Sequence, residues 1–224
     1  YEAVRAAVSR EVHEEMERFG VEKTKLLVLD ALMKLRQVCN HPRLLKLPSA
    51  QRGKNSAKMD LLMEWVPSMV QDGRKILIFS QFTGMLELIE EALRKEGIRF
   101  LTLTGQSKDR GKLCDDFQSG EAPVFLISLR AGGTGLNLTL ADTVIHFDPW
   151  WNPALEAQAT DRAYRIGQKN PVFVYKLITA GTIEEKILLL QQKKRALFEG
   201  ILDGTPQKLS FSEDELNDLL SPVK

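Results

Sequence analysis

The chain has 224 residues, of which 43% are hydrophobic, and its formal net charge is +1. This length supports one domain with a buried core and extensions, and the near-zero charge excludes a nucleic-acid binder that depends on the field of the whole molecule. No apolar run approaches the roughly 18 residues of a membrane span and no signal-peptide pattern is present, so we expect an intracellular protein with no membrane contact.

The N-terminal part is predicted to be helical. Apolar residues recur every three or four positions through residues 1–19, which indicates an amphipathic helix. A second helix is expected over about 24–39, before Pro42. The polar stretch 48–55 contains Gly and Ser and is typical of a linker. We therefore assign residues 1–55 to a helical protrusion and linker.

The central part is predicted to be an α/β lobe. A third helix is expected from Ser56, interrupted at Pro67 and closed by Gly73. Short apolar runs then alternate with helical patterns. Continuous apolar strands joined by helical crossovers predict a parallel sheet with helices on both faces, and ligands of such sheets collect at the carboxyl ends of the strands. The expected strands are 76–79, 98–103, 124–127, 143–147 and 172–177, with helices near 84–96, 108–118 and 153–165.

The C-terminal part is predicted to be a long helix followed by an acidic tail. Residues 182–185 have the pattern of a capping box, which begins the helix, and residues 212–220 are expected to form a short acidic helix. We assign residues 56–181 to the α/β lobe and 182–224 to a C-terminal brace helix and acidic tail.

Two arginines are expected to share one face of the helix that follows the fourth strand. Asn152 is a good N-cap and Pro153 suits the first helical position. Gln158, Arg162 and Arg165 then follow at spacings of four and three, so both guanidinium groups should point the same way. Such a pair suits a polyphosphate, because the planar guanidinium binds phosphate oxygens bidentately. The alternative is a solvated, salt-bridged helix face.

A glycine-rich loop precedes this helix. The segment 132–135 has little side chain, so its backbone N–H groups can approach a phosphate closely. A Rossmann pyrophosphate loop or a tight turn would look similar. However, Leu138 stands where the third glycine of GxGxxG belongs, and Asp148 comes sooner than the acid that binds a ribose.

These segments together resemble a known family. GGTGLNL at 132–138, DPWWNP at 148–153 and QATDRAYRIGQ at 158–168 resemble motifs V and VI of the SWI/SNF-type DNA translocases, a branch of the superfamily-two helicase-like ATPases. KILIFSQFT at 75–83 resembles motif IV, and LRQVCNHPRLL at 35–45 resembles the segment leading into it. The resemblance implies a RecA-like fold and the role of the second, C-terminal lobe of a two-lobe motor.

The resemblance also implies roles for single residues. Arg162 and Arg165 match the arginine fingers of motif VI, with Gln158 beside them, while Gly135 and Asn137 would face the nucleotide. Hydroxyl and amide groups at strand ends are otherwise local caps, and each tryptophan is as well explained by packing. The residues implied to contact DNA are Ser80, Gln81, Thr104, Ser107, Arg130, Gly132, Gly133, Thr134, Trp150 and Trp151.

Other parts of an ATPase are absent from the sequence. It contains no GxxxxGK followed by Ser or Thr, and no strand-terminal Asp-Glu pair for magnesium. ATP and Mg²⁺ would therefore require an N-terminal lobe, and because Tyr1 already lies in a helical pattern we expect a longer protein. Cys39, Cys114 and His41 lack metal-ligand spacing, so no metal site is predicted within this chain.

The leading hypothesis is half of a monomeric, double-stranded DNA translocase that works with the N-terminal ATPase lobe of the same protein. The alternative is a non-catalytic DNA-binding or regulatory module, and a Rossmann-type enzyme is disfavoured by the loop spacing. The short connection 45–56, the stretch GQSKDRGKLCDDF and the tail SFSEDELNDLL resemble bacterial members. We expect a cytoplasmic, nucleoid-associated protein if it is bacterial and a nuclear one if it is eukaryotic.

Overall fold

The computed structural model describes residues 1–19, 21–45, 56–131, 136–150, 152–165, 167–168, 170–199 and 218–222. The chain divides into two compact units, Tyr1–Ser56 with Thr179–Lys224, and Ala57–Ile178. The first unit thus combines the two ends of the chain, which sequence reasoning treats as separate parts. None of the helices in the described residues is sufficiently long and apolar to cross a membrane.

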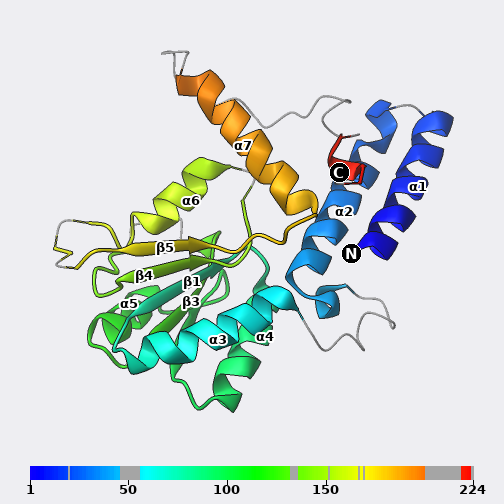
Figure 1. The fold of residues 1–224 in the computed structure, drawn as a ribbon. Coiled ribbons are helices and arrows are strands. Elements are labelled where there is room, and N and C mark those ends of the chain that lie inside the picture. Colours follow the sequence, from blue (N-terminus) through cyan, green and yellow to red (C-terminus); the bar gives the residue numbers. More distant parts are fainter. Residues whose placement is uncertain are drawn as a thin grey trace. The chain divides into compact units, whose positions relative to one another are not determined.

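A five-stranded, all-parallel sheet forms the centre of the unit Ala57–Ile178 (Figure 1). The strand order is β2-β3-β1-β4-β5, so the first strand lies in the middle of the sheet and is buried along its whole length. All five predicted strands are confirmed: β1 Ile76–Ser80, β2 Phe100–Leu103, β3 Val124–Ser128, β4 Thr143–His146 and β5 Phe173–Lys176.

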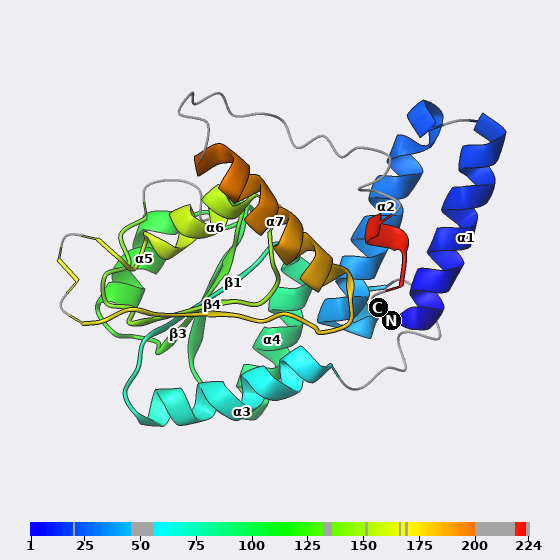
Figure 2. The same ribbon diagram turned by 45° about the horizontal axis from the view of Figure 1, so that its top comes forward.

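Helices cover both faces of this sheet (Figures 1 and 2). One face is covered by α3 (Ala57–Gln71) and α4 (Thr83–Lys95), which bury Leu62, Val66 and Ile89 among other side chains. The opposite face is covered by α5 (Arg110–Gln118) and α6 (Pro153–Thr160). Phe117 and Ala159 of these helices belong to one core cluster with alternate residues of the strands, such as Leu77, Phe79, Phe125, Ile127 and Val144.

Pro67 lies within α3, which continues to Gln71, so the expected interruption of this helix is wrong. A proline removes one backbone hydrogen bond and kinks a helix when nothing else holds it. Here Leu62 and Val66 are fully buried just before the proline. Burial of two such side chains contributes about 3 to 6 kcal/mol, which offsets the loss.

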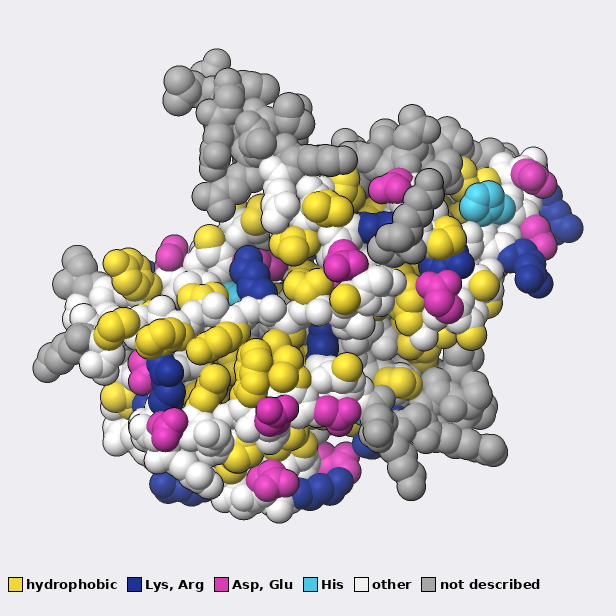
Figure 3. Space-filling model, viewed as in Figure 1, with side chains coloured by type: hydrophobic (Ala, Val, Ile, Leu, Met, Phe, Trp, Pro, Cys, Tyr) yellow, Lys and Arg dark blue, Asp and Glu magenta, His cyan; other side chains and the backbone are white. Residues whose placement is uncertain are grey.

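The edge strand β5 carries exposed apolar side chains. Phe173 is 47% exposed and Val174 44% exposed. Figure 3 shows hydrophobic side chains gathered along this strand and toward α3, where the rings of Trp65 and Tyr175 lie 5.4 Å apart between centroids. The guanidinium of Arg74 lies over the Phe173 ring at 4.3 Å, so a charged group partly covers this edge.

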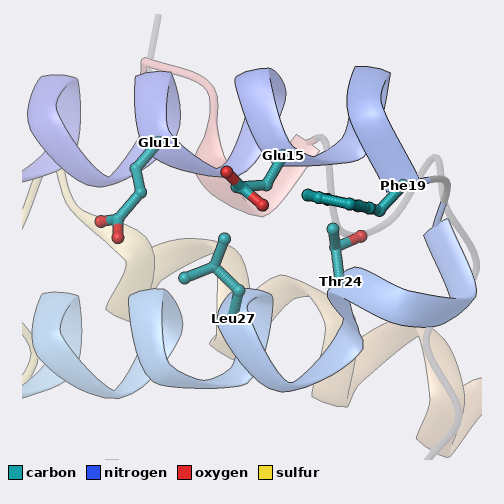
Figure 4. A pocket seen from close by; sticks show the side chains of 5 residues that line it. All are labelled: Glu11, Glu15, Phe19, Thr24 and Leu27. Carbon is teal, nitrogen blue, oxygen red and sulfur yellow. The ribbon is translucent and has the colours of Figure 1, made fainter.

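The other unit contains a helical hairpin. The helices α1 (Glu2–Phe19) and α2 (Val21–Asn40) run antiparallel, and the short 3-10 helix η1 (Pro42–Leu44) follows. His41 caps η1, since its Nδ1 accepts the Arg43 N–H at 3.1 Å. A groove of about 410 Å³ lies between α1 and α2; Glu11, Glu15 and Phe19 of α1 line it together with Thr24 and Leu27 of α2 (Figure 4).

The C-terminal helix α7 (Ile183–Glu199) belongs to the same unit as the hairpin. The Ile183 N–H donates to the Tyr1 hydroxyl at 2.9 Å, and the Thr182 hydroxyl accepts the Glu184 N–H at 3.2 Å. Glu185 accepts from the Gly181 N–H, so the expected reciprocal capping box is present in a shifted form. Of the predicted acidic tail helix, residues 218–220 are helical and residues 212–217 lie outside the described part.

Candidate phosphate and DNA site

The carboxyl ends of the strands meet at one edge of the sheet. The register places Ser80 beside Ser128 and Phe79 beside His146, with Leu103 beside Ile127. Parallel strands in such a register bring the segments that follow them together. The segments after β1, β2, β3 and β4, which contain most of the predicted site residues, therefore leave the sheet at the same edge.

The helix α6 begins as the sequence predicts and ends earlier. The Ala154 N–H donates to Asn152 Oδ1 at 3.0 Å, which confirms the N-cap, and Pro153 occupies the first helical position. The helix ends at Thr160, so the expectation that Arg162 and Arg165 form a stripe on it is wrong. The tight turns after Thr160 place the Arg162 side chain inside the lobe, with the residue 4% exposed, and leave Arg165 exposed.

Hydrogen bonds from backbone and side-chain donors join the arginine turn to the segment after the glycine loop. The Leu138 N–H donates to the Arg162 carbonyl at 3.1 Å, and Arg165 Nη1 lies 3.5 Å from the Leu136 carbonyl. Gln168 Nε2 donates to the carbonyls of Ala141 at 2.7 Å and Ala163 at 3.1 Å. The two motifs thus form one piece of structure although 20 or more residues separate them in sequence.

The electrostatics of the arginine turn favour an anion. Burial, and then the charge of neighbouring Arg165, lower the pKa of Arg162, while Asp161 opposes them. The Nε of Arg162 is buried and has no hydrogen-bond partner among the described residues. A buried guanidinium N–H without an acceptor costs free energy that a phosphate oxygen would recover. These residues therefore fit a nucleotide phosphate.

A nucleotide phosphate is commonly accompanied by Mg²⁺, so the acidic residues of the lobe matter for this ion as well. Within the part of the chain that the structure describes, no group of three or more His, Cys, Asp or Glu side chains is arranged to hold a metal ion. Mg²⁺ takes carboxylate oxygens, waters and substrate phosphates as ligands.

The turn after β4 is fixed by buried charged groups. Asp148 is 1% exposed; it accepts a hydrogen bond from Ser80 Oγ and another from the Gln81 N–H at 3.2 Å. Glu156 is 2% exposed and accepts the Trp150 N–H at 2.7 Å. The Trp150 side chain is half-buried and packs against the core cluster of the lobe. One of the two predicted tryptophans therefore combines packing with partial exposure, and Trp151 lies outside the described residues.

The remaining predicted residues differ in how accessible they are. Ser80 is fully buried with its hydroxyl bound to Asp148, so a direct phosphate contact would first require this bond to break. Thr104 and Ser107 bond to each other in one turn, with the Thr104 N–H donating to Ser107 Oγ at 3.0 Å. Gln81 is partly exposed, whereas Arg130, Asn137 and Gln158 are exposed. Gly132, Gly133, Thr134 and Gly135 lie outside the described residues.

The comparison with known proteins places this geometry in a family. A family model described as the helicase conserved C-terminal domain matches residues 57–167. The structure is also similar to the C-terminal domain of the Sulfolobus solfataricus SWI2/SNF2 ATPase, with a TM-score of 0.70 and 35% identity over 91% of this chain and 85% of that one. The chain belongs to the SWI2/SNF2 family. Its α/β lobe has the RecA-like fold of the family's C-terminal domains, as the motifs predict.

Two further relatives bear on the role of this SWI2/SNF2 lobe. The Sulfolobus solfataricus SWI2/SNF2 ATPase core in complex with dsDNA matches with a TM-score of 0.72 and 38% identity, over 90% of this chain and 42% of that one. YwqA of Bacillus subtilis, an ATP-dependent helicase/translocase by name, is 42% identical over 202 residues, which are 88% of this chain and 22% of YwqA. The chain spans about a fifth of the curated relatives it matches. They include bacterial and plant proteins, so the bacterial origin stays a prediction.

Sequence reasoning missed several residues that hold the SWI2/SNF2 site together. From the sequence, Asp148 is considered only as a ribose ligand, and Glu156 and Lys58 have no predicted role. Lys58 of α3 is buried and donates to the Phe147 carbonyl at 2.9 Å, from a position 89 residues away in sequence. A signal was available for Asp148 and Glu156, because acidic side chains that flank a turn between a strand and a helix N-terminus commonly bind its backbone N–H groups.

Proposed function

We propose that this chain is the second motor lobe of an ATP-dependent double-stranded DNA translocase. In this role it supplies arginine fingers to ATP and half of the groove that contacts the DNA backbone. The observation that carries the proposal is the Nε of Arg162, which is buried and has no hydrogen-bond acceptor among the described residues. Exposed Arg165 lies in the same turn, and this turn is hydrogen-bonded to the segment after the glycine loop. Membership of the SWI2/SNF2 family supports it.

The proposed chemistry is stabilisation of developing phosphate charge. A transferred phosphoryl group spreads negative charge over its oxygens, and a preorganised guanidinium stabilises that charge without reorganising at the moment of reaction. Arg162 is held by burial and by its bonded carbonyl, so its position is set in advance. Arg165 is exposed and can reach a nucleotide bound mainly by the N-terminal lobe of the same protein. That lobe would bring the phosphate cradle and the ligands for Mg²⁺.

The proposed DNA contact also lies at the carboxyl ends of the strands. The chain's net charge is +1, so contact with the duplex depends on local groups. Exposed Arg130 after β3 and the half-buried Trp150 after β4 are such groups among the described residues. A related core was solved in complex with dsDNA, which supports duplex DNA as the substrate proposed here. We propose that one copy of the protein acts on its own and that its compartment is the one that contains DNA.

The first test uses this chain in isolation. We expect it to hydrolyse ATP at no measurable rate, because its sequence lacks the phosphate-binding lysine loop and the Asp-Glu pair. Its binding to duplex DNA should be weak and should fall steeply between 50 and 200 mM salt, since phosphate contacts release counterions. Steady-state ATPase assays and fluorescence anisotropy with a labelled duplex measure both.

The two-lobe protein is the matched control for this test. It should show ATP hydrolysis that duplex DNA stimulates. Robust turnover by the isolated chain would contradict the half-motor proposal. A two-lobe protein that binds duplex DNA without hydrolysing ATP would instead favour a non-catalytic DNA-binding or regulatory module.

A further inference from the structure

We infer that Glu156 is a positioning residue that fixes the Trp150 turn in the orientation used to contact duplex DNA. The inference rests on the proposed function, because it takes this turn as part of the DNA groove. It concerns the way in which the lobe orients a partly exposed aromatic residue, and it assigns a role to a buried carboxylate that touches neither the nucleotide nor the DNA.

The two oxygens of Glu156 have two different partners. Oε1 accepts the Trp150 N–H at 2.7 Å, and Oε2 accepts a hydrogen bond from Lys176 Nζ. Glu156 lies in the first turn of α6, and Lys176 ends β5, so one side chain joins the turn, the helix and the edge strand. The Glu156 side chain is 2% exposed. A charged acceptor makes a stronger bond to a backbone N–H than a neutral one, and the lysine compensates the buried charge.

The opposite end of the turn is held independently of Glu156. Asp148 accepts from Ser80 Oγ and from the Gln81 N–H, and Lys58 donates to the Phe147 carbonyl. The turn is therefore attached on its β4 side to α3 and to the end of β1. On its α6 side, Asn152 caps the helix and Glu156 holds the Trp150 backbone. Loss of the Glu156 bond should free the Trp150 backbone while the β4 side stays in place.

Trp150 is the residue whose position this bond decides. Its side chain is half-buried against the core cluster, so a change in the backbone direction at Trp150 changes which part of the ring is exposed. Stacking on an aromatic ring contributes on the order of tenfold or more per base to nucleic-acid affinity. A ring held in one orientation contributes more than one that samples several, because less conformational entropy is lost on binding.

The test is Glu156→Gln in the two-lobe protein. The amide keeps one oxygen for the Trp150 N–H, but its NH₂ group faces the Lys176 ammonium. We expect the duplex concentration that gives half-maximal ATPase stimulation to rise about tenfold, with kcat at saturating DNA within about threefold of the parent. Hydrogen exchange of the Trp150 amide, followed by NMR or in the peptide that carries it, should become faster.

A second substitution provides the rescue. In Glu156→Gln with Lys176→Gln, the NH₂ group at position 156 can donate to the amide oxygen at position 176. The amide oxygen at position 156 then stays free to accept the Trp150 N–H. In this double variant, the duplex concentration that gives half-maximal ATPase stimulation should return to within about threefold of the parent value. A general loss of stability would not produce this recovery. If Glu156→Gln does not fold, Lys176→Gln takes its place. The Lys176 side chain is 42% exposed, and its loss removes the charged partner of Glu156, so a shift in the same direction is expected.

Glu184→Gln is the matched control. Glu184 is fully buried and accepts the Thr179 N–H at 2.8 Å, in the other unit of the chain. Its substitution should leave the duplex concentration for half-maximal ATPase stimulation unchanged. Unchanged DNA dependence and unchanged Trp150 amide exchange in Glu156→Gln would overturn the inference. If duplex DNA does not stimulate the parent protein, the proposed function fails instead, and amide exchange still decides whether Glu156 holds the turn.

Discussion

Arg165→Ala and Arg162→Ala, each made in the two-lobe protein, are expected to lower the DNA-stimulated kcat by about 10²-fold or more. An arginine finger acts mainly on the charge of the transition state and is typically worth about 10³ to 10⁵ in rate. DNA affinity without nucleotide should stay close to that of the parent, because the interaction does not exist in that state. Steady-state ATPase assays at saturating duplex DNA and ATP measure the effect.

The two arginines differ in burial, so their alanine variants should differ in stability as well as in activity. Arg165 is exposed, so Arg165→Ala should leave the melting temperature almost unchanged and report on catalysis alone. Arg162 is 4% exposed, so Arg162→Ala should also lower stability through lost packing. Lysine at either position should rescue poorly, since an ammonium cannot reproduce the planar fork. Near-normal kcat in both well-folded alanine variants would leave the two arginines as structural or solvated residues.

The features that sequence predicted well are those set by local patterns. Five short apolar runs, most of them separated by helical patterns, are sufficient to define a parallel sheet, and every strand end lies within two residues of its predicted position. The N-cap at Asn152 depends only on a side chain and an N–H two residues away, so it is predictable from the immediate sequence. The motifs added the family and the RecA-like fold, which periodicity alone does not distinguish from other doubly wound sheets.

The features that sequence missed depend on distant partners. Helical periodicity continues past Thr160, yet the helix ends there because Ala163 enters the core and the Arg162 carbonyl bonds to Leu138. The burial of Arg162 follows from that turn and could not be deduced from spacing. In the same way, Asp148 meets Ser80 and Gln81 only because β1 and β4 are neighbours in the sheet.

His146 gives the lobe an expected sensitivity to acid. It ends β4, stacks on Phe79 with 5.6 Å between ring centroids, and is 1% exposed. The Thr160 hydroxyl lies 3.1 Å from the Glu156 carbonyl, which only accepts, so the hydroxyl donates there and accepts from His146 Nε2 at 3.0 Å. Nδ1 of His146 is then the basic atom, and it is buried without a hydrogen-bond partner among the described residues.

Burial lowers the pKa of His146 from its usual 6.5 to about 4; Glu156 opposes the shift and Lys176 adds to it. The unfolded chain therefore binds a proton at a higher pH than the folded lobe does. The stability contributed by neutral His146 is complete above pH 6.5 and is lost as the pH falls toward 4, by about 3 kcal/mol in all. Between pH 7 and pH 5 the expected loss is about 2 kcal/mol.

Urea unfolding of the parent and of His146→Gln at pH 7, 6 and 5 measures this loss. The glutamine stays neutral and its amide can still donate to the Thr160 hydroxyl, so its free energy of unfolding should change with pH by about 2 kcal/mol less than that of the parent over this interval. Carboxylates that titrate at the lower end of the range are common to both proteins and cancel in the comparison. His13→Gln, on the exposed face of α1, is the control for a His-to-Gln change outside the lobe. If the parent and His146→Gln lose stability equally between pH 7 and pH 5, the folded lobe accommodates a charged His146, and the buried Nδ1 must find an acceptor that the neutral state does not use.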